Sequence, residues 1–387
     1  MRPPSIDRET ITGDAEAVAR VDNQPLDPTF KGSFLIPGTE TRLRVGGFAR
    51  VDFIHDFRPI GSTDDFVVAT IPVDAVSDLD NSTIHARETR FNFELRRPSR
   101  VGSLRVLFEY DFFADQGERA LNLRHAYGQI ANLLLGFTVS TLQDVDARPD
   151  ILDYEGPPGR ISARQAQIRY TLRLSDEQSV AIAAEEPKPN IAADSEHDVT
   201  IRTPWPDMIV RYRMESRRSH LQVGAVFRSL GGFAGTGIQQ AQVLGSGLAV
   251  SGSWAQNRRN IVLLQTAAGR GLSRYIKDTS NAPLDLAVDS QGRVRAVPLV
   301  SAVAGFQRGW TTTLRSTFAA SLVEASRIDG LAADAYRESR YLSANIMHFA
   351  SPFTIGIEYG VGRFETQNGH HNWNGRVQVA LQYDLVK

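Results

Sequence analysis

Two carboxylates stand two residues apart in the stretch SLRVLFEYDFF, at Glu109 and Asp111. Side chains at this spacing share one face of a β-strand, and paired carboxylates are the groups that hydrolyse glycosidic bonds. Arg105 lies on the same face of the same stretch. The pattern therefore favours acids that balance neighbouring arginines, and a soluble or surface β-rich protein that binds or hydrolyses carbohydrate is the alternative function.

Other patterns that could carry chemistry are weaker. Consecutive His370 and His371 in NGHHNW point apart in an extended chain, and no third ligand follows at motif spacing. The stretch GRGLSRY has glycines without the spacing of a phosphate-binding loop. The chain has no cysteine, which removes thiolate metal sites and disulfide frameworks. We expect no catalytic residue, no metal site and no cofactor.

The most distinctive connection is QDVDARPDILDYEGPPGR, residues 143–160, which is rich in acids. If it folds into a water-filled channel and its carboxylates face arginines on the wall, the opposed charges produce a transverse field that orients charged solutes. The alternative is that the acids only solvate an exposed loop. The candidate residues of this connection are Asp144, Asp146, Arg148, Asp150 and Asp153, with Glu155 and Arg160 beside them.

Arginine dominates the basic residues. The chain has 43 lysines and arginines, of which only Lys31, Lys188, Lys277 and Lys387 are lysines. Arginine is suited to bidentate contacts with carboxylate and phosphate groups, although a GC-rich genome also explains the bias. An anion-preferring, arginine-lined pore is therefore a hypothesis. Its candidate wall residues are Arg42, Arg44, Arg50, Arg90, Arg105, Arg169 and Arg173, together with the acids Glu109 and Asp111.

The segments that must position these residues alternate strictly between polar and apolar side chains. In RLRVGGFARVDF, residues 42–53, the charged residues share one parity, and Leu43, Val45, Val51 and Phe53 share the other. The same alternation recurs in RFNFELRR, SLRVLFEYDFF, QAQIRYTLRL and GRVQVALQYDLV. One such strand is also typical of a soluble core, but charge on one face throughout the chain indicates a membrane barrel with a watery interior.

Long and short connections alternate between these segments, as in outer-membrane barrels. Short turns such as PSRVG and LSDEQ alternate with long connections, which lie near residues 58–82, 143–163, 187–207, 270–296 and 365–373. We predict an all-β fold, a transmembrane antiparallel β-barrel of about 16 strands. Arginines facing lipid near the midplane would cost about 2 to 4 kcal/mol each, so the charged face is the channel face.

Composition sets further bounds on the 387-residue chain. No run of about 18 apolar residues is present, which excludes a transmembrane helix, and the net charge of -1 argues against nucleic acid as a partner. Residues 1–38 are polar and broken by proline, so we expect an N-terminal periplasmic extension before a barrel over residues 39–387. The start MRPPSIDRET has no apolar h-region, and we expect the signal peptide of an exported protein to lie outside this numbering.

With the strands in place, the chain resembles the DcaP-like family of trimeric outer-membrane porins. No single matching stretch is a catalytic signature, but together they follow one another in order along almost the whole chain. The matching stretches are GSFLIPGTETRLRVGGFARVDFIHDF (32–57), RFNFEL (90–95), FEYDFF (108–113), LNLRHAYGQI (121–130), LLLGFTVSTLQD (133–144), PDILDYEGPPGR (149–160), GRGLSRYIKD (269–278), TLRSTF (313–318) and IEYGVGRFETQNG (357–369).

This resemblance implies a 16-stranded barrel with an inward-folded third extracellular loop. It also implies a homotrimer in the bacterial outer membrane, in contact with lipid and lipopolysaccharide. It also implies passive uptake of small anionic solutes, dicarboxylates among them, without enzymatic activity. Arg42, Arg44, Arg50 and the connection from Asp144 to Arg160 become candidates for the narrowest part of the pore. A further possibility is a closed barrel that serves as a structural or adhesion protein through its loops. Conductance measurements distinguish such a barrel from a porin.

Overall fold

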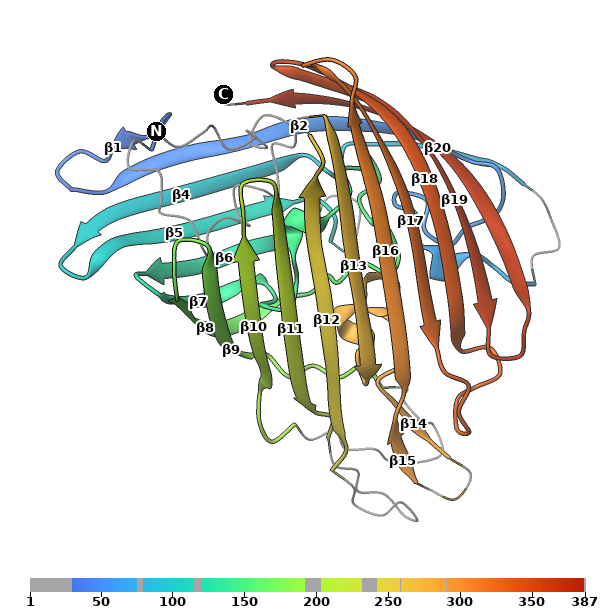
Figure 1. Ribbon diagram of the computed structural model, residues 1–387. Coiled ribbons are helices and arrows are strands. Elements are labelled where there is room, and N and C mark those ends of the chain that lie inside the picture. The colour runs from blue at the N-terminus through green and yellow to red at the C-terminus, as the bar shows by residue number, and fades with distance from the viewer. Residues whose placement is uncertain are drawn as a thin grey trace.

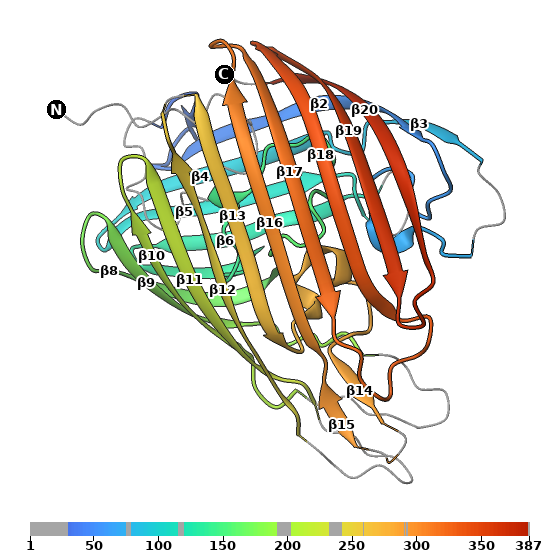
Figure 2. The same ribbon diagram turned by 45° about the vertical axis from the view of Figure 1, so that its right-hand side comes forward.

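The chain folds into a closed antiparallel barrel, which the computed structural model describes for residues 30–74, 79–114, 120–191, 203–231, 242–257, 259–289, 291 and 293–385 (Figures 1 and 2). Sixteen strands of these described residues form its wall. Consecutive wall strands pair along the chain, and β20 (His371–Asp384) pairs with β2 (Arg42–Asp56) to close the ring. The predicted fold class is confirmed.

The wall strands are mostly 8 to 15 residues long, as tilted strands that cross a bilayer must be. Between the first and the last they are β4 (Arg90–Ser99), β5 (Gly102–Asp111), β6 (Asn122–Ile130), β7 (Leu133–Val139), β8 (Arg164–Arg173), β9 (Gln178–Glu185), β10 (Asp207–Glu215), β11 (Ser219–Ser229), β12 (Leu244–Ala255), β13 (Asn260–Arg270), β16 (Pro298–Gly309), β17 (Leu314–Ala325), β18 (Tyr336–Ala350) and β19 (Phe353–Thr366).

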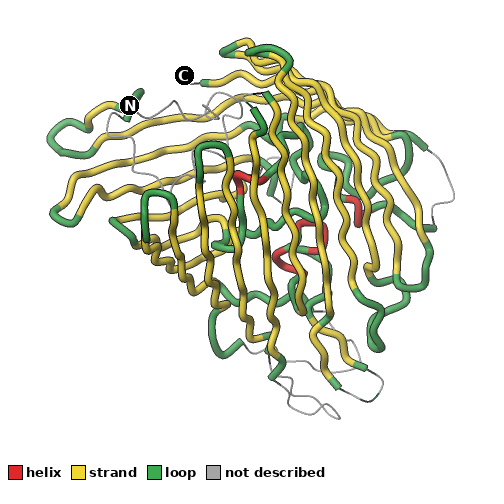
Figure 3. Tube along the Cα trace, in the orientation of Figure 1, coloured by secondary structure: helices red, strands yellow, loops and turns green. Residues whose placement is uncertain are grey.

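Shorter elements complete the wall and the connections. Strand β3 (Asn81–His85) pairs with the last residues of β2, and β4 pairs with the first residues of β2. Strands β3 and β4 therefore occupy the position of a single second wall strand that is interrupted between them. A small hairpin, β14 (Leu286–Val288) and β15 (Val294–Ala296), lies in a connection. The described helices are single 3₁₀ turns, drawn in red in Figure 3: η3 (Val68–Thr70), η4 (Val145–Ala147), η5 (Ser273–Tyr275) and η6 (Lys277–Thr279). No helix of the described residues has the length and apolarity to cross a membrane.

The alternating pattern sets which face of each strand looks inward. On β2, Arg50 and Asp52 are buried, whereas Val51 and Phe53 are 49% and 42% exposed on the outside. Charged side chains therefore face the interior and apolar ones face outward, where a membrane covers them. The predicted orientation of this strand is confirmed.

Connections of two kinds lie at opposite ends of the barrel. Turns of two to four residues join β4 to β5, β6 to β7 and the later pairs at one end, called here the short-turn end. The other end, the long-connection end, carries the longer segments, three of which matter below. They are loop L1 (residues 57–89), loop L3 (residues 140–163) and loop L6 (residues 271–297).

These three loops fill part of the barrel with an apolar core. Phe66 and Val68 of loop L1, Ile161 of loop L3, and Tyr275 and Ile276 of loop L6 belong to one buried cluster. The cluster also contains inward-facing residues of the wall from β10 to β19, namely Ile209, Val226, Ala249, Ala267, Leu299, Val323, Ala325, Tyr336, Tyr341 and Phe364. We call this cluster the interior plug.

The N-terminal segment also contacts the barrel. Residues 1–29 of the predicted extension lie outside the described residues. Phe30 is buried, with its ring under the guanidinium groups of Arg96 and Arg44 at 4.0 and 5.2 Å. Next, β1 (Phe34–Leu35) pairs with the first residues of β2. The end of the extension therefore lies against the short-turn end of the barrel.

Candidate functional site: the barrel interior

Loop L3 crosses the interior and is held by the wall on several sides. The Leu152 amide donates to Glu358 Oε2 on β19 at 2.9 Å, and the Gly159 amide donates to Ser321 Oγ on β17 at 2.7 Å. On the opposite wall, Arg124 of β6 donates to the hydroxyl of Tyr154 at 3.1 Å. Most residues of this loop are buried. These contacts place loop L3 inside the barrel.

Asp144 fixes the beginning of this loop. Its carboxylate accepts hydrogen bonds from Arg213 Nη1 at 3.1 Å, His220 Nε2 at 2.8 Å and Ser251 Oγ at 2.7 Å. Burial by itself raises the pKa of Asp144, but the charge of Arg213 and the bonds from His220 and Ser251 outweigh it and hold the pKa well below its ordinary value. Asp144 is therefore a charged anchor of loop L3.

His220 also bonds to Ser253 through Nδ1 at 2.8 Å, so serine, histidine and aspartate stand in the order of a hydrolase triad. Ser253 is only 4% exposed, and its hydroxyl lies on the wall behind loop L3. A hydroxyl buried to this extent does not favour attack on a substrate carbonyl. The chain of bonds fixes the His220 ring and, through Asp144, the loop.

The remaining acids of loop L3 hold the loops together. Asp146 pairs with Arg213 at 2.5 Å, and Asp150 pairs with Arg315 of β17. Asp153 accepts a bond from the Phe66 amide of loop L1 at 2.9 Å. It also lies 3.6 Å from Arg376 Nη1 of β20. The partners of these acids thus lie on β10, β17 and β20, and not on β2, β4, β5 and β8, where the predicted wall arginines lie.

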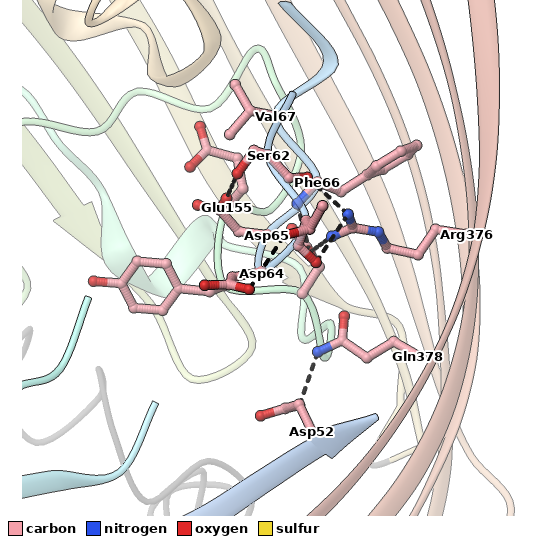
Figure 4. Close-up of polar contacts among 12 residues, drawn as sticks. Asp52, Ser62, Asp64, Asp65, Phe66, Val67, Glu155, Arg376 and Gln378 are labelled. Atoms are coloured by element: carbon pink, nitrogen blue, oxygen red, sulfur yellow. Dashed lines mark hydrogen bonds and ion pairs between the residues drawn. The ribbon is translucent and has the colours of Figure 1, made fainter. Parts of the chain in front are cut away.

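Arg376 extends this network from the wall to loop L1. Figure 4 shows its side chain reaching from β20 toward the segment of Ser62 to Phe66. Its guanidinium pairs with Asp56 at 2.8 Å and donates to the carbonyl oxygen of Ser62 at 2.9 Å. Beside it, Gln378 donates to Asp52 of β2 at 2.8 Å (Figure 4). Arg376 therefore links both loop L1 and loop L3 to β20.

Glu155 joins loop L3 to loop L6 through an ion pair with Lys277. Burial raises its pKa from the ordinary 4.5 to about 7, although the ammonium group of Lys277 opposes the rise. The native state therefore binds more protons than the unfolded state between these values. The stability that this residue contributes is present below about pH 4.5 and is lost as the pH rises through about 7.

Exchanging Glu155 for glutamine should remove this part of the pH dependence. The effect amounts to up to about 3 kcal/mol between pH 4.5 and 8, from about 1.4 kcal/mol per unit of pKa. Unfolding by urea in lipid vesicles at pH 5 and pH 8 measures it. The wild type should lose more stability over this interval than E155Q, and identical losses in the two proteins would contradict the assignment.

The predicted wall arginines lie at different levels of the barrel. At the short-turn end, the single carboxylate of Glu94 accepts bonds from Arg44 at 2.6 Å, Arg96 at 2.8 Å and Arg105 at 2.6 Å. Three guanidinium groups around one carboxylate leave this mouth of the channel positive. Arg42 and Arg173 are exposed at the same end, away from loop L3.

Arg50 supports loop L3 directly. It pairs with Asp52 at 2.7 Å and with Glu88 at 3.0 Å, and it donates to the carbonyl oxygen of Leu152 at 2.5 Å. Arg169 is buried on the inward face of β8.

Glu109 and Asp111 face the interior, as predicted from their parity. Arg124 of β6 donates to both, at 2.9 and 2.7 Å, and Arg90 of β4 lies 3.7 and 3.6 Å from them. Each carboxylate is thus engaged by two guanidinium groups, which is the arrangement of a structural ion-pair network. This geometry does not favour the hydrolytic alternative, which needs two carboxylates facing an open substrate site.

Five arginines gather where loop L3 approaches this wall: Arg90, Arg124, Arg148, Arg160 and Arg164. Burial and the nearby charge of Arg124 lower the pKa of Arg148, and burial and the charge of Arg148 lower that of Arg160. Within the described residues, neither Arg148 nor Arg164 forms an ion pair, and both are partly exposed. We call these five residues the arginine cluster.

Sequence reasoning missed Arg124 and Arg164. The pairing of β5 with β6 shifts register between Glu109 and Tyr110. This bulge turns both Arg124 and its neighbour His125 inward. Simple alternation places only one of two neighbouring residues on the channel face, so the signal is visible only once the strand pairing is known. Arg164 is the first residue of β8 and has the parity of outward residues.

The described residues hold no group of three or more histidine, aspartate or glutamate side chains placed to bind a metal ion. Ion pairs with arginine or lysine occupy Asp144, Asp150 and Glu155. The charges and the shape of the interior are therefore set by loop L3, the interior plug and the arginine cluster.

Comparison with known proteins agrees with this geometry. The outer membrane channel DcaP of Acinetobacter baumannii superposes with a TM-score of 0.81 at 18% identity, over 92% of this chain and 100% of that one. An anion-selective porin from Comamonas acidovorans gives 0.60 at 10% identity, over 89% and 100%. The trimer form of OmpT from Vibrio cholerae gives 0.54 at 10% identity, over 89% and 99%.

These likenesses show the porin fold. No curated protein matches the chain. The family model of the DcaP outer membrane protein matches residues 27–385, which is nearly the whole chain. The chain therefore belongs to the DcaP outer membrane protein family and is a β-barrel porin of the bacterial outer membrane.

Proposed function

We propose that this porin is an anion-preferring diffusion channel for small hydrophilic acids, dicarboxylates among them. The observation that carries the proposal is the arginine cluster, in which Arg148 and Arg164 have no ion-pair partner within the described residues. A carboxylate solute offers the bidentate partner that a guanidinium group prefers. Passage needs no chemistry and no energy input, so we expect no enzymatic activity.

The interior plug supports a defined route for the solute. Its apolar side chains pack against the wall from β10 to β19, where a hydrated anion would lose its water without compensation. In the described part of the chain, strands β2 to β8 contribute no residue to this plug, and their inward face holds buried charged residues such as Arg90, Arg105 and Glu109. The proposed path therefore runs between loop L3 and the wall of β4, β5 and β6, past the arginine cluster, to the positive mouth around Glu94.

Two of the similar structures also support the proposed function. One is described as an anion-selective porin and another was solved as a trimer. We propose that this chain likewise works as a homotrimer in which each barrel conducts separately. The outward apolar faces of the strands contact lipid or a neighbouring subunit.

Flux of two solutes of equal length and opposite charge tests the preference. Vesicles that contain the purified protein are loaded with radiolabelled succinate, a four-carbon dianion, or putrescine, a four-carbon diamine. Succinate should leave severalfold faster than putrescine, and 1 M salt should reduce the difference because it screens the arginine charges. Equal rates, or faster putrescine, would overturn the proposed anion preference.

A further inference from the structure

The outer surface of the barrel carries an apolar groove of about 960 Å³ that crosses the strands from β10 to β18. Its floor contains the small outward-facing residues Gly252, Ala302, Ala304 and Ala320, and Trp254 lies beside them. The inward-facing neighbours of these residues, such as Ser253 and Val303, are less than a tenth exposed. The open surface of the groove is therefore the outward one, which faces the membrane.

Strand register explains the shape of the groove. Leu342 of β18 pairs with Ala320 of β17, Ala320 pairs with Ala304 of β16, and Ala304 pairs with Leu264 of β13. Two alanines thus lie side by side between leucines that are 58% and 56% exposed. A row of small side chains flanked by large ones leaves a trough in an otherwise even apolar surface, and an extended hydrocarbon chain fills such a trough by dispersion contacts.

The groove ends at a positive site. Arg340 of β18 belongs to its lining, and its side chain is 63% exposed. Arg363 of β19 lies directly opposite Arg340 in the strand pairing. Like charges directly opposite each other destabilise a sheet. Glu338 pairs with both arginines, at 2.7 and 3.4 Å. Glu365 pairs with Arg363 at 2.8 Å and with Arg327 at 3.5 Å, so three arginines share two carboxylates and one positive charge is in excess.

This site lies near the outer rim of the membrane. Arg340 and Arg363 stand close to the start of β18 and the end of β19, at the long-connection end of the barrel. In outer-membrane barrels the longer connections face the outside of the cell. The two arginines are thus at the level of the headgroups of the outer leaflet, while the groove descends from them into the hydrocarbon region.

We propose that the groove and the Arg340–Arg363 pair together bind lipopolysaccharide, the phosphorylated and acylated lipid of the outer leaflet. Its phosphate accepts bonds from the two guanidinium groups, and one of its acyl chains lies over Ala304 and Ala320. Exposed ion pairs contribute little to stability, so exchanging the bond of Arg340 with Glu338 for one with phosphate costs little. The bound phosphate balances the positive charge that Glu338 and Glu365 leave in excess.

Binding of lipid A to the detergent-purified protein, followed by native mass spectrometry, tests the headgroup site. R340A/R363A should weaken binding at least tenfold. The matched control R217A/R218A removes the same charge from exposed arginines in the turn at the short-turn end and should bind as the wild type does. Equal binding by R340A/R363A and the wild type would overturn the proposal.

The groove itself is tested by filling it. Ala304→Trp should weaken lipid A binding severalfold because the indole occupies the trough, whereas Ala166→Trp, at an exposed outward position of β8, should not. Two further results would assign another occupant and overturn the proposal. One is phosphatidylglycerol binding as tightly as lipid A at this site. The other is disulfide crosslinking of Ala304→Cys between two copies of the chain in the membrane.

Discussion

Replacing Arg148 and Arg164 together by glutamine is expected to remove most of the preference for anions. Both guanidinium groups belong to the arginine cluster and have no ion-pair partner within the described residues, so their charge acts on the solute. A unit charge about 10 Å from a solute, at an effective dielectric constant of about 20, contributes about 1.7 kcal/mol. That energy exceeds a factor of ten in relative concentration, and two charges are removed.

The ratio of succinate to putrescine flux measures this effect, and it should fall at least tenfold in R148Q/R164Q. A control with the same charge change is R217Q/R218Q, at two exposed arginines in the turn between β10 and β11. This control should keep the wild-type ratio. If both variants keep it, the arginine cluster does not determine selectivity.

Ile276→Asp is expected to open the channel by breaking the interior plug. Ile276 is fully buried, and its backbone pairs with that of Ile161, which joins loop L6 to loop L3. An unpaired carboxylate at this buried position costs several kcal/mol. The loops should therefore separate, and the conductance of single channels should rise and fluctuate.

The conservative variant Ile276→Val separates this effect from a simple loss of folding. It keeps the site apolar and costs about 1 kcal/mol, so its conductance should equal that of the wild type. Recordings of single channels from both variants, inserted into the same planar lipid, provide the comparison. An unchanged conductance in I276D would show that the plug does not border the conducting path.

Alternation along the strands was sufficient to predict the barrel and the face of each charged residue on β2, β4 and β5. Arg50, Arg90 and Glu109 all lie inward as their parity requires, because a side chain on the wrong face would place charge in lipid. The ends of the strands followed from the same pattern and from the turns. The local order of residue types thus determines the strands and the direction in which their side chains face.

The contents of the barrel could not be predicted in the same way. Ile209 and Val226 face inward among charged residues. Their apolar character is explained only by loops L1, L3 and L6, which cover them inside the barrel. The inward position of Arg124 depends on the bulge opposite Glu109. The partners of Asp144, Asp150 and Asp153 lie on strands that are 69 to more than 200 residues away along the chain. Each of these features depends on long-range pairing.

The most direct test of the account is the reversal potential of the wild-type protein in a planar bilayer under a gradient of potassium chloride. An arginine-lined path past loop L3 predicts a potential of the sign of an anion-selective channel, with conductance that closes in three equal steps and flickers when succinate is added. A potential of the opposite sign, or a bilayer without conductance steps, would contradict the central claim that the arginine cluster makes this porin a channel for anions.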